Sequence, residues 1–248
     1  MSSTSLTEFC LETLSQEIAL QRVAGLEEIA TVKLLNGKDG GGIEVYKGDQ
    51  GGKIDKVTLV DLKFGDGAPI PHHDHALSTG AEIFQILPDL SYKLPIWGIN
   101  TVIMKDGAYH FDTDFTFGFD LVTDYEFTMK YLDPFNKVYK KFWGHKDFKR
   151  VFLDETTTWV RTYISPVFIM VKTRVENMAT VHELCAEFIK CWLTMCREAQ
   201  QKDDAYKQQQ LARIKSQYAG MQRTDRMGKV ILDIYGKETF AKFFKAML

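Results

Sequence analysis

Apolar residues recur at two different spacings along the chain, and the spacing changes near residue 175. Before this point, five runs rich in β-branched and aromatic residues are separated by Gly, Pro and Asp, which is typical of strands. They are residues 56–64, 81–87, 97–104, 109–117 and 159–173. The run YHFDTDFTF alternates polar and aromatic residues, as expected of a strand with one buried face. The links between the runs are too short for crossover helices, so we expect adjacent strands to pair antiparallel.

Helical spacing is found at both ends of the chain and in its middle. Residues 5–23 are expected to form a helix that Ser5 and Glu8 cap, and residues 123–142 a second one. After residue 175, Thr180 and Glu183 predict another capping box before a helical run, and the segments 203–218 and 228–247 continue as helices with a break at Gly236. The Gly-rich stretch 35–55 predicts hairpin turns around a short strand.

Together these elements predict an α+β fold. Helices before, within and after an antiparallel sheet are most simply arranged on both of its faces, as an α/β/α sandwich. Neither an internal repeat nor a linker divides the sequence, so residues 1–248 are expected to form a single domain.

Composition narrows the range of partners. The chain is 45% hydrophobic and 26% charged, with a formal net charge of -2, so a bulk polyanion is not expected to bind. Its 17 Phe, 10 Tyr and 4 Trp suit a large core or a pocket for a flat apolar ligand. The acidic N-terminus indicates a mature sequence, and no run approaches the ~18 apolar residues of a membrane span. The four cysteines, without C-x-x-C spacing, are expected to be free thiols in a reducing compartment.

The stretch GDGAPIPHHDHALSTGAE, residues 65–82, holds three of the six histidines. His73, His75 and Glu82 are close to the first metal-binding motif of cupins, in which two His and a Glu hold one ion. However, six residues separate His75 from Glu82 where three or four are usual, and no second cupin motif follows. A solvated hairpin loop is therefore favoured, and no metal is expected. Nucleotide-binding and G-x-S-x-G motifs are also absent.

Three segments carry a resemblance to a known family. They are ILPDLSYKLPIWGINTVIMKDGAYHFDTDFTF (86–117), YISPVFIMVKT (163–173) and MQRTDRMGKVILDIYGKETFAKFFKAML (221–248). In this order they resemble the ferredoxin-dependent bilin reductases, over most of residues 56–248. The resemblance implies a six-stranded antiparallel sheet flanked by helices. A linear tetrapyrrole, biliverdin or dihydrobiliverdin, is then expected between the sheet and the C-terminal helices.

The resemblance also implies how the chemistry proceeds. No metal or organic cofactor is bound; electrons arrive singly from the 2Fe-2S cluster of reduced ferredoxin, and side chains supply protons. Carboxyls with a pKa raised by burial suit that role. We expect a monomer that binds neither nucleic acid nor membrane, in the cytoplasm if the source is cyanobacterial or a phage, and in the plastid stroma if it is algal.

Three residues follow from the family's catalytic and propionate positions. Asn100 stands where the family has its central catalytic Asp, and an amide is no useful proton donor. Asp225 matches the second family Asp and is the best candidate donor. Arg226 matches a basic position suited to a bilin propionate.

Further candidates line the expected pocket. Ile83 replaces the His of phycocyanobilin-forming members, which favours a phycoerythrobilin-forming type. Asp61 maps onto a family Glu, and Lys172 and Ser165 lie on the strand that lines the propionate side. His75 is placed at the pocket's edge, where it can meet a propionate or assist proton delivery.

The segment 135–152 concentrates basic and aromatic residues. Complementary charge would speed its association with an acidic ferredoxin. Single-stranded nucleic acid and a plain solvated helix end are the alternatives. The basic residues are Lys137, Lys140, Lys141, Lys146, Lys149 and Arg150.

The leading hypothesis is reduction of biliverdin or dihydrobiliverdin toward phycoerythrobilin or a related bilin. A non-catalytic bilin-binding protein is the alternative, because Asn100 replaces the Asp, and a cupin-like metal-dependent enzyme comes third. The residues alone also leave ordinary roles open: Asp225 as a helix N-cap, Lys172 as a surface charge and Asn100 as a buried amide.

Overall fold

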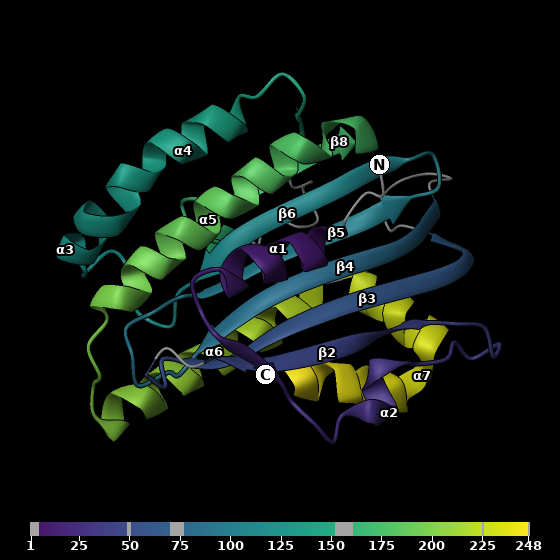
Figure 1. Ribbon diagram of the computed structural model, residues 1–248, viewed down its shortest axis with the longest axis horizontal. Coiled ribbons are helices and arrows are strands. Elements are labelled where there is room, and N and C mark those ends of the chain that lie inside the picture. The colour runs from purple at the N-terminus through teal and green to yellow at the C-terminus, as the bar shows by residue number, and fades with distance from the viewer. Residues whose placement is uncertain (1–4, 49–50, 70–76, 152–160, 225, 248) are drawn as a thin grey trace.

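One antiparallel sheet of eight strands organises the computed structural model, and helices lie on both of its faces (Figure 1). The structure describes residues 5–48, 51–69, 77–151, 161–224 and 226–247; for residues 221–224, 226, 227 and 244 it describes the backbone only. The predicted α+β class is confirmed. The sheet has two more strands than the resemblance implies, because the short β1 and β7 extend its two edges.

The strands follow the order β1-β2-β3-β4-β5-β6-β8-β7 across the sheet, so that only the last two are out of chain order. Their bounds are β1 Leu20–Arg22, β2 Gly41–Gly48, β3 Ile54–Pro69, β4 Leu77–Pro88, β5 Ile96–Met104, β6 Ala108–Thr116, β7 Lys149–Arg150 and β8 Ile169–Arg174. The helices are α1 Leu6–Ser15, α2 Glu27–Ala30, α3 Tyr125–Phe127, the π-helix η1 Thr128–Leu132, α4 Asp133–Trp143, the 3-10 helix η3 Val175–Asn177, α5 Met178–Glu198, α6 Asp204–Thr224 and α7 Arg226–Met247.

One face of the sheet packs against α1 and α5 and is called the α1/α5 face. Leu59, Phe84 and Ile99 are successive partners across β3, β4 and β5, and all three are buried there. Phe188 of α5 lies 5.1 Å, between ring centroids, from Phe115 of β6. Most of the buried apolar core lies on this face. Burial of such side chains is the main favourable term in folding, so this face contributes most to stability.

The opposite face packs against α6 and α7 and is called the α6/α7 face. Tyr235 of α7 is buried, and its hydroxyl reaches the carbonyl oxygens of Gly40 (2.7 Å) and Lys63 (2.9 Å). On α6, the Tyr218 hydroxyl accepts a hydrogen bond from Nε2 of Gln85 in β4 at 2.7 Å. These bonds hold both C-terminal helices against the sheet.

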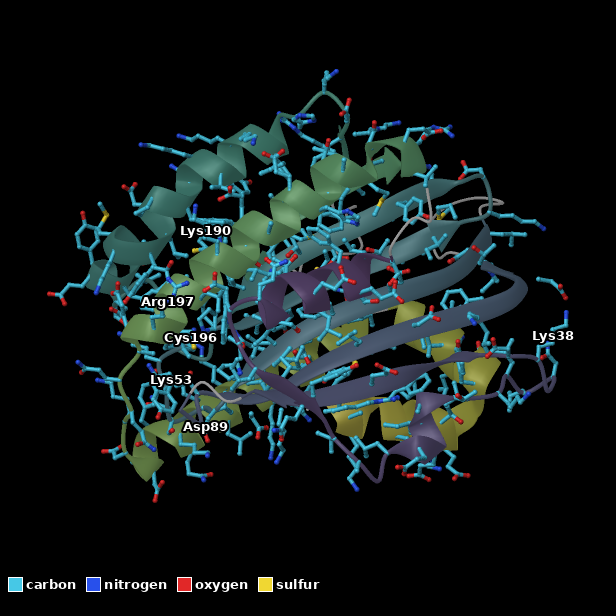
Figure 2. All side chains as sticks on the ribbon, viewed as in Figure 1. Lys38, Lys53, Asp89, Lys190, Cys196 and Arg197 are labelled. Carbon is cyan, nitrogen blue, oxygen red and sulfur yellow. The ribbon has the colours of Figure 1, made fainter. Side chains whose placement is uncertain are left out.

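Lys53, just before β3, stabilises the C-terminal end of α5 from outside that helix. Its Nζ donates to the carbonyl oxygens of Cys196 (2.8 Å) and Arg197 (3.2 Å), and Figure 2 shows the three residues together. A cation at this position satisfies carbonyls that have no partner within the helix, and it opposes the negative end of the helix dipole.

Three predicted elements differ from the structure. The first helix ends at Ser15 rather than at residue 23, because residues 20–22 pair with β2 as β1. The capping box at Thr180 does not form; α5 begins at Met178, and the Thr180 hydroxyl instead reaches Asp147 at 3.5 Å. In the predicted strand 159–173, residues 161–168 are turns and a short 3-10 segment, and only β8 is extended.

Candidate functional site

The centre of the α6/α7 face holds a row of side chains from three neighbouring strands. Ile83 of β4, Asn100 of β5 and Asp112 of β6 are direct partners in the antiparallel register. Nδ2 of Asn100 donates to Oδ1 of Asp112 at 2.8 Å. Asn100 is therefore tied to a carboxyl; because its side chain is exposed, the alternative of a buried amide is wrong.

This row is open although it lies in the middle of the sheet. Asn100 is exposed on an interior strand, and its neighbours Ile83, Val102 and Asp112 are only partly buried. At Gly98, two residues before Asn100, an added Cβ would have the Phe84 carbonyl oxygen, 4.0 Å away, as its closest neighbour among the described atoms. The described parts of α6 and α7 thus leave a recess over the centre of β5.

A second carboxyl, Asp114, lies two residues beyond Asp112 on the same face. The backbone N–H of Ser165 donates to its Oδ2 at 2.8 Å, and the Ser165 hydroxyl donates to its Oδ1. Burial raises the pKa of Asp114 to about 7, against the hydrogen bonds from Ser165 and Phe115, which lower it, and the charge of Asp112 raises it further. Asp114 is consequently a carboxyl that can hold a proton near neutrality.

One row further along the face, a basic residue borders the recess. Lys172 of β8 is the partner of His110 of β6, and both share the face of Asp112 and Asp114. His110 is buried and Lys172 partly buried. The structure therefore places Ile83, Asn100 and Lys172, three of the residues singled out from the sequence, on one face of the sheet, and it bonds a fourth, Ser165, to Asp114 of that face.

Asp61 does not join them, because it lies on the α1/α5 face, opposite Glu82 in the register. Oε2 of Glu82 accepts the backbone N–H of Leu6, the first residue of α1, at 3.0 Å. Desolvation raises the pKa of both Asp61 and Glu82. The hydrogen bond from Leu6 lowers the pKa of Glu82, but desolvation outweighs it. Their place across the sheet separates them from Asn100.

Three other predicted residues are placed less fully. Asp225 and His75 lie outside the described residues, so the proposed donor and the pocket-edge histidine have no described position. Arg226 is the first residue of α7, of which only the backbone is described there.

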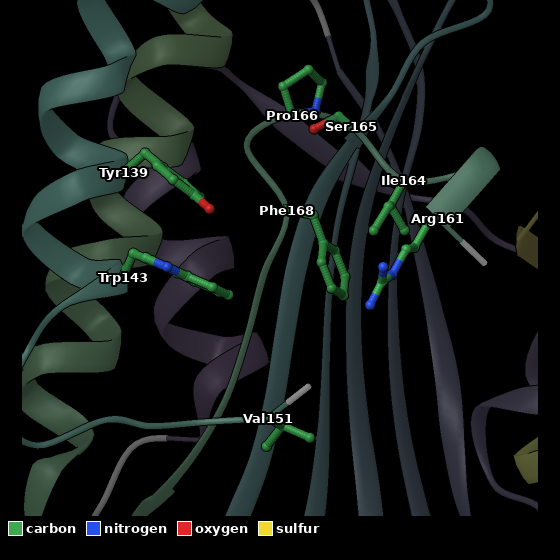
Figure 3. Close-up of a pocket in the computed structure, with 8 residues that line it drawn as sticks. All are labelled: Tyr139, Trp143, Val151, Arg161, Ile164, Ser165, Pro166 and Phe168. Carbon is green, nitrogen blue, oxygen red and sulfur yellow. The ribbon is translucent and has the colours of Figure 1, made fainter. Parts of the chain in front are cut away.

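A pocket of about 470 Å³ opens beside Ser165 (Figure 3). Tyr139 and Trp143 of α4 form one wall, and Phe168 and Arg161 lie opposite them. Ser165 lines this pocket and also donates hydrogen bonds to Asp114, so the pocket and Asp114 are joined through one residue. The sequence did not predict this aromatic lining, because the lining residues come from two segments, α4 and the turn at residues 161–168, that meet only in the folded chain.

The basic segment runs from α4 to β7 along the outside of the molecule. All six of its predicted docking residues are exposed: Lys137, Lys140, Lys141, Lys146, Lys149 and Arg150. Lys141 forms an ion pair with Glu183 of α5 at 2.5 Å, and Nε of Arg150 donates to the Trp143 carbonyl oxygen at 2.8 Å. The segment therefore presents a positive surface beside the aromatic pocket.

Sequence reasoning missed Asp112 and Asp114 as site residues. The signal was present in YHFDTDFTF, because two Asp residues separated by one position share a face of a strand. Pairing of the predicted strands 97–104 and 109–117 through the turn at Gly107 would have placed Asp112 opposite Asn100.

Neither a metal-ligating cluster nor a membrane-spanning helix occurs among the described residues. Within them, no three His, Cys, Asp or Glu side chains are grouped to hold a metal ion. The histidines of the cupin-like hypothesis, His73 and His75, lie outside this part of the chain. Among the same described residues, no helix has the length and apolar character needed to cross a membrane.

Comparison with known proteins gives a family and a fold. The family model described as "Ferredoxin-dependent bilin reductase" matches residues 79–248. A crystal structure of selenomethionine-labelled phytochromobilin synthase from tomato, in complex with biliverdin, is similar with a TM-score of 0.69 and 15% sequence identity. That match covers 96% of this chain and 81% of that chain. A comparison with curated proteins finds no significant match.

The raised pKa of Asp114 predicts how stability changes with pH. An unfolded Asp has a pKa of about 3.9, whereas Asp114 in the folded protein has a pKa of about 7. The folded state therefore keeps a proton that the unfolded state releases, and Asp114 should lower the free energy of unfolding as pH rises from about 4 to 7, by at most about 1.4 kcal/mol per pH unit.

Asp114→Asn should remove this contribution. Urea unfolding at several pH values would show the wild type losing stability relative to the variant over that range. A constant difference between the two proteins across it would contradict the assignment. Asp133→Asn, which removes an exposed carboxyl at the start of α4, serves as the control and should leave the pH dependence of the wild type unchanged.

Proposed function

Because the chain belongs to the ferredoxin-dependent bilin reductase family, we propose that it reduces a linear tetrapyrrole bound on the α6/α7 face of the sheet. The observation that carries this proposal is the recess over β5, where Asn100 is exposed at the centre of the sheet and Gly98 leaves room above the strand. The tetrapyrrole is proposed to be biliverdin or 15,16-dihydrobiliverdin. The tomato protein of similar fold was crystallised with biliverdin, which supports that choice.

The lining of the recess suits the chemistry of such a ligand. A linear tetrapyrrole has flat apolar surfaces, an inner edge of nitrogen and oxygen atoms, and two anionic propionates. Ile83 and Val102 offer apolar contact, and Asn100 with Asp112 offers a donor and an acceptor. Lys172 offers a cation at the border of the recess for a propionate. Arg226 is proposed for the second propionate on the strength of the family motif.

The product is proposed to be phycoerythrobilin or a related bilin. Ile83 lies directly beside Asn100 in the register, at the position where phycocyanobilin-forming members carry a His. An aliphatic side chain supplies no proton, so protonation from this side of the ligand has to come from other groups. Asp225, at the family's second Asp position, is proposed as one of these, and His75 as an assisting group at the pocket's edge.

Reduced ferredoxin is proposed to dock on the basic segment from α4 to β7. The exposed cations of this segment are complementary to an acidic partner, and charge complementarity raises the rate of association. The protein itself is proposed to carry no tightly bound cofactor, since the electrons come from the iron–sulfur cluster of the partner. It is proposed to work as a monomer.

A specific observation favours a second candidate function. Asn100 is an amide at the family's central acid position, and it is held by a hydrogen bond to Asp112. A chain that binds bilin at this recess without reducing it would show the same geometry.

One experiment separates the two functions. Biliverdin is added to the protein without oxygen, and reduced ferredoxin follows. A reductase converts the biliverdin absorbance band into bands at shorter wavelength, with a product identified by chromatography. A spectral change on binding, followed by no reaction, would identify a bilin-binding protein.

Asn100→Asp should bind biliverdin within about threefold of the wild type.

Filling the recess should abolish ligand binding. Gly98→Leu places a side chain into open space on a strand with ordinary backbone angles, so the fold should tolerate it. The affinity for biliverdin, measured by absorbance titration, should fall at least about tenfold. Gly144→Leu adds the same side chain at the end of α4, where an added Cβ would make only ordinary van der Waals contacts, and should leave binding unchanged. Equal affinities for the two variants would place the ligand elsewhere.

Reversing the charge of the basic segment should impair the reaction with ferredoxin alone. In the triple variant Lys137→Glu, Lys140→Glu and Lys149→Glu, the KM for ferredoxin should rise at least about tenfold, and the salt dependence of the rate should weaken. Biliverdin affinity should stay constant. The matched control reverses three exposed lysines outside the segment, Lys47, Lys237 and Lys245, and should keep the wild-type KM. A similar KM in both triple variants would locate docking away from the segment.

A further inference from the structure

The β5–β6 hairpin places a carboxyl directly against the amide that replaces the family acid. Asn100 and Asp112 are partners in the register, and the Asn100 N–H is 2.8 Å from the carboxylate oxygen, measured between the heavy atoms. An amide side chain neither gains nor loses a proton near neutral pH, whereas a carboxyl does both. At this position the protonatable group is therefore on β6 rather than on β5.

We propose that Asp112 is the carboxyl that protonates the tetrapyrrole at the centre of the recess, and that Asn100 is a positioning residue that holds this carboxyl. The inference rests on the proposed function and adds to it a residue that the family motif does not supply. Asp112 is partly buried beside an exposed residue, so it borders both the recess and solvent.

The step balances in electrons and protons. Reduction of one carbon–carbon double bond takes two electrons and two protons, and two reduced ferredoxin molecules are each oxidised by one electron. After an electron reaches the tetrapyrrole, the O–H bond of Asp112 breaks and a C–H or N–H bond forms on the ligand. Water then returns a proton to the Asp112 carboxylate. Asp112 can supply both protons in successive steps, or share them with another donor.

Asp114 is less suited to this role. Its carboxylate accepts hydrogen bonds from the Ser165 N–H, the Ser165 hydroxyl and the Phe115 N–H, so both oxygens are tied to the protein. These bonds anchor the turn before β8 to the sheet. Asp114 acts on Asp112 through charge instead, because ionisation of one carboxyl opposes ionisation of the other.

Other groups on the same face affect the charge of Asp112. Within the described side chains, His110 and Asp114 lie on β6, Lys172 lies on β8, and Tyr218 reaches the face from α6. Burial raises the pKa of Tyr218 to about 12, so this tyrosine stays neutral. β5 contributes the neutral Asn100.

The test exchanges the two side chains of the pair. Asp112→Asn should bind biliverdin within about threefold of the wild type, while the rate of product formation with reduced ferredoxin falls about 10²-fold or more, the usual contribution of a general acid. The double variant Asn100→Asp/Asp112→Asn keeps an amide–carboxyl pair but moves the carboxyl to β5. It should recover at least about tenfold of the lost rate.

A second measurement tests the positioning role of Asn100. Asn100→Ala removes the hydrogen bond that favours the charged carboxylate, so the pH above which the rate falls should move upward. A purely structural role would lower the rate without moving the profile. Asp106→Asn, in the turn of the same hairpin, removes a carboxylate that accepts the backbone N–H of Ala108 and should behave as the wild type.

Each outcome bears on a different claim. A wild type that binds biliverdin but does not reduce it would overturn the proposed reductase function, and this inference with it. An active wild type with an equally active Asp112→Asn would overturn the inference alone. If Asp112→Asn also loses binding or stability, the double variant decides: recovered turnover supports a proton donor, and a double variant as inactive as Asp112→Asn overturns it.

Discussion

Side chains on a strand alternate between the two faces of the sheet, and every feature of the site depends on this alternation. In β5, Trp97 and Ile99 point to the α1/α5 face and are buried, whereas Gly98 and Asn100 point to the recess. A slip of one residue in the register would exchange these sets and place Ile99 in the recess and Asn100 in the core. The large apolar core on one face therefore fixes the position of the polar groups on the other.

The two faces also differ in what a raised pKa signifies. Glu82 and Asp114 are both carboxyls with a raised pKa on interior strands. Glu82 accepts the N–H of Leu6 at the start of α1 and thereby joins a helix to the sheet. Asp114 anchors a turn, and it stands beside a second carboxyl at the border of a recess. A perturbed pKa thus indicates a functional site only when open space and a partner group accompany it.

The sequence predicted the fold well where local pattern and tertiary packing agree. The alternation of YHFDTDFTF and the helical spacing of α5 both place apolar residues on one side, and the structure buries those residues. Prediction failed where pairing across the chain overrides local spacing. Ile18 continues the apolar spacing of α1 and is buried, yet the helix ends at Ser15 because residues 20–22 join β2. In the run 159–173, Ser165 lies in a turn and donates a hydrogen bond to Asp114. This long-range contact cannot be read from the β propensity of the run.

The site, too, was predicted only where local sequence motifs were sufficient. Asn100, Ile83, Lys172 and Ser165 came from motifs, and the structure places the first three on one face and bonds Ser165 to Asp114 of that face. Asp61 came from a motif as well. Side chains alternate between the faces along β3, and Asp61 lies two residues from Leu59, so it is on the opposite face from Asn100. Asp112 and Asp114 required the pairing of two strands, which is a relation between segments rather than a property of either one. Residue roles are thus best inferred after register has been assigned.

The register also gives a physical meaning to the amide at position 100. An Asp at this position would face Asp112, and two carboxylates about 4 Å apart would repel by about 4 kcal/mol at an effective dielectric constant near 20. Such a pair would hold one proton between them near neutral pH. With Asn100, the same contact becomes a hydrogen bond from a neutral donor to one defined carboxyl. Asp112 is then the one protonatable group of this pair, so an amide at position 100 still leaves a titratable carboxyl at this point of the face.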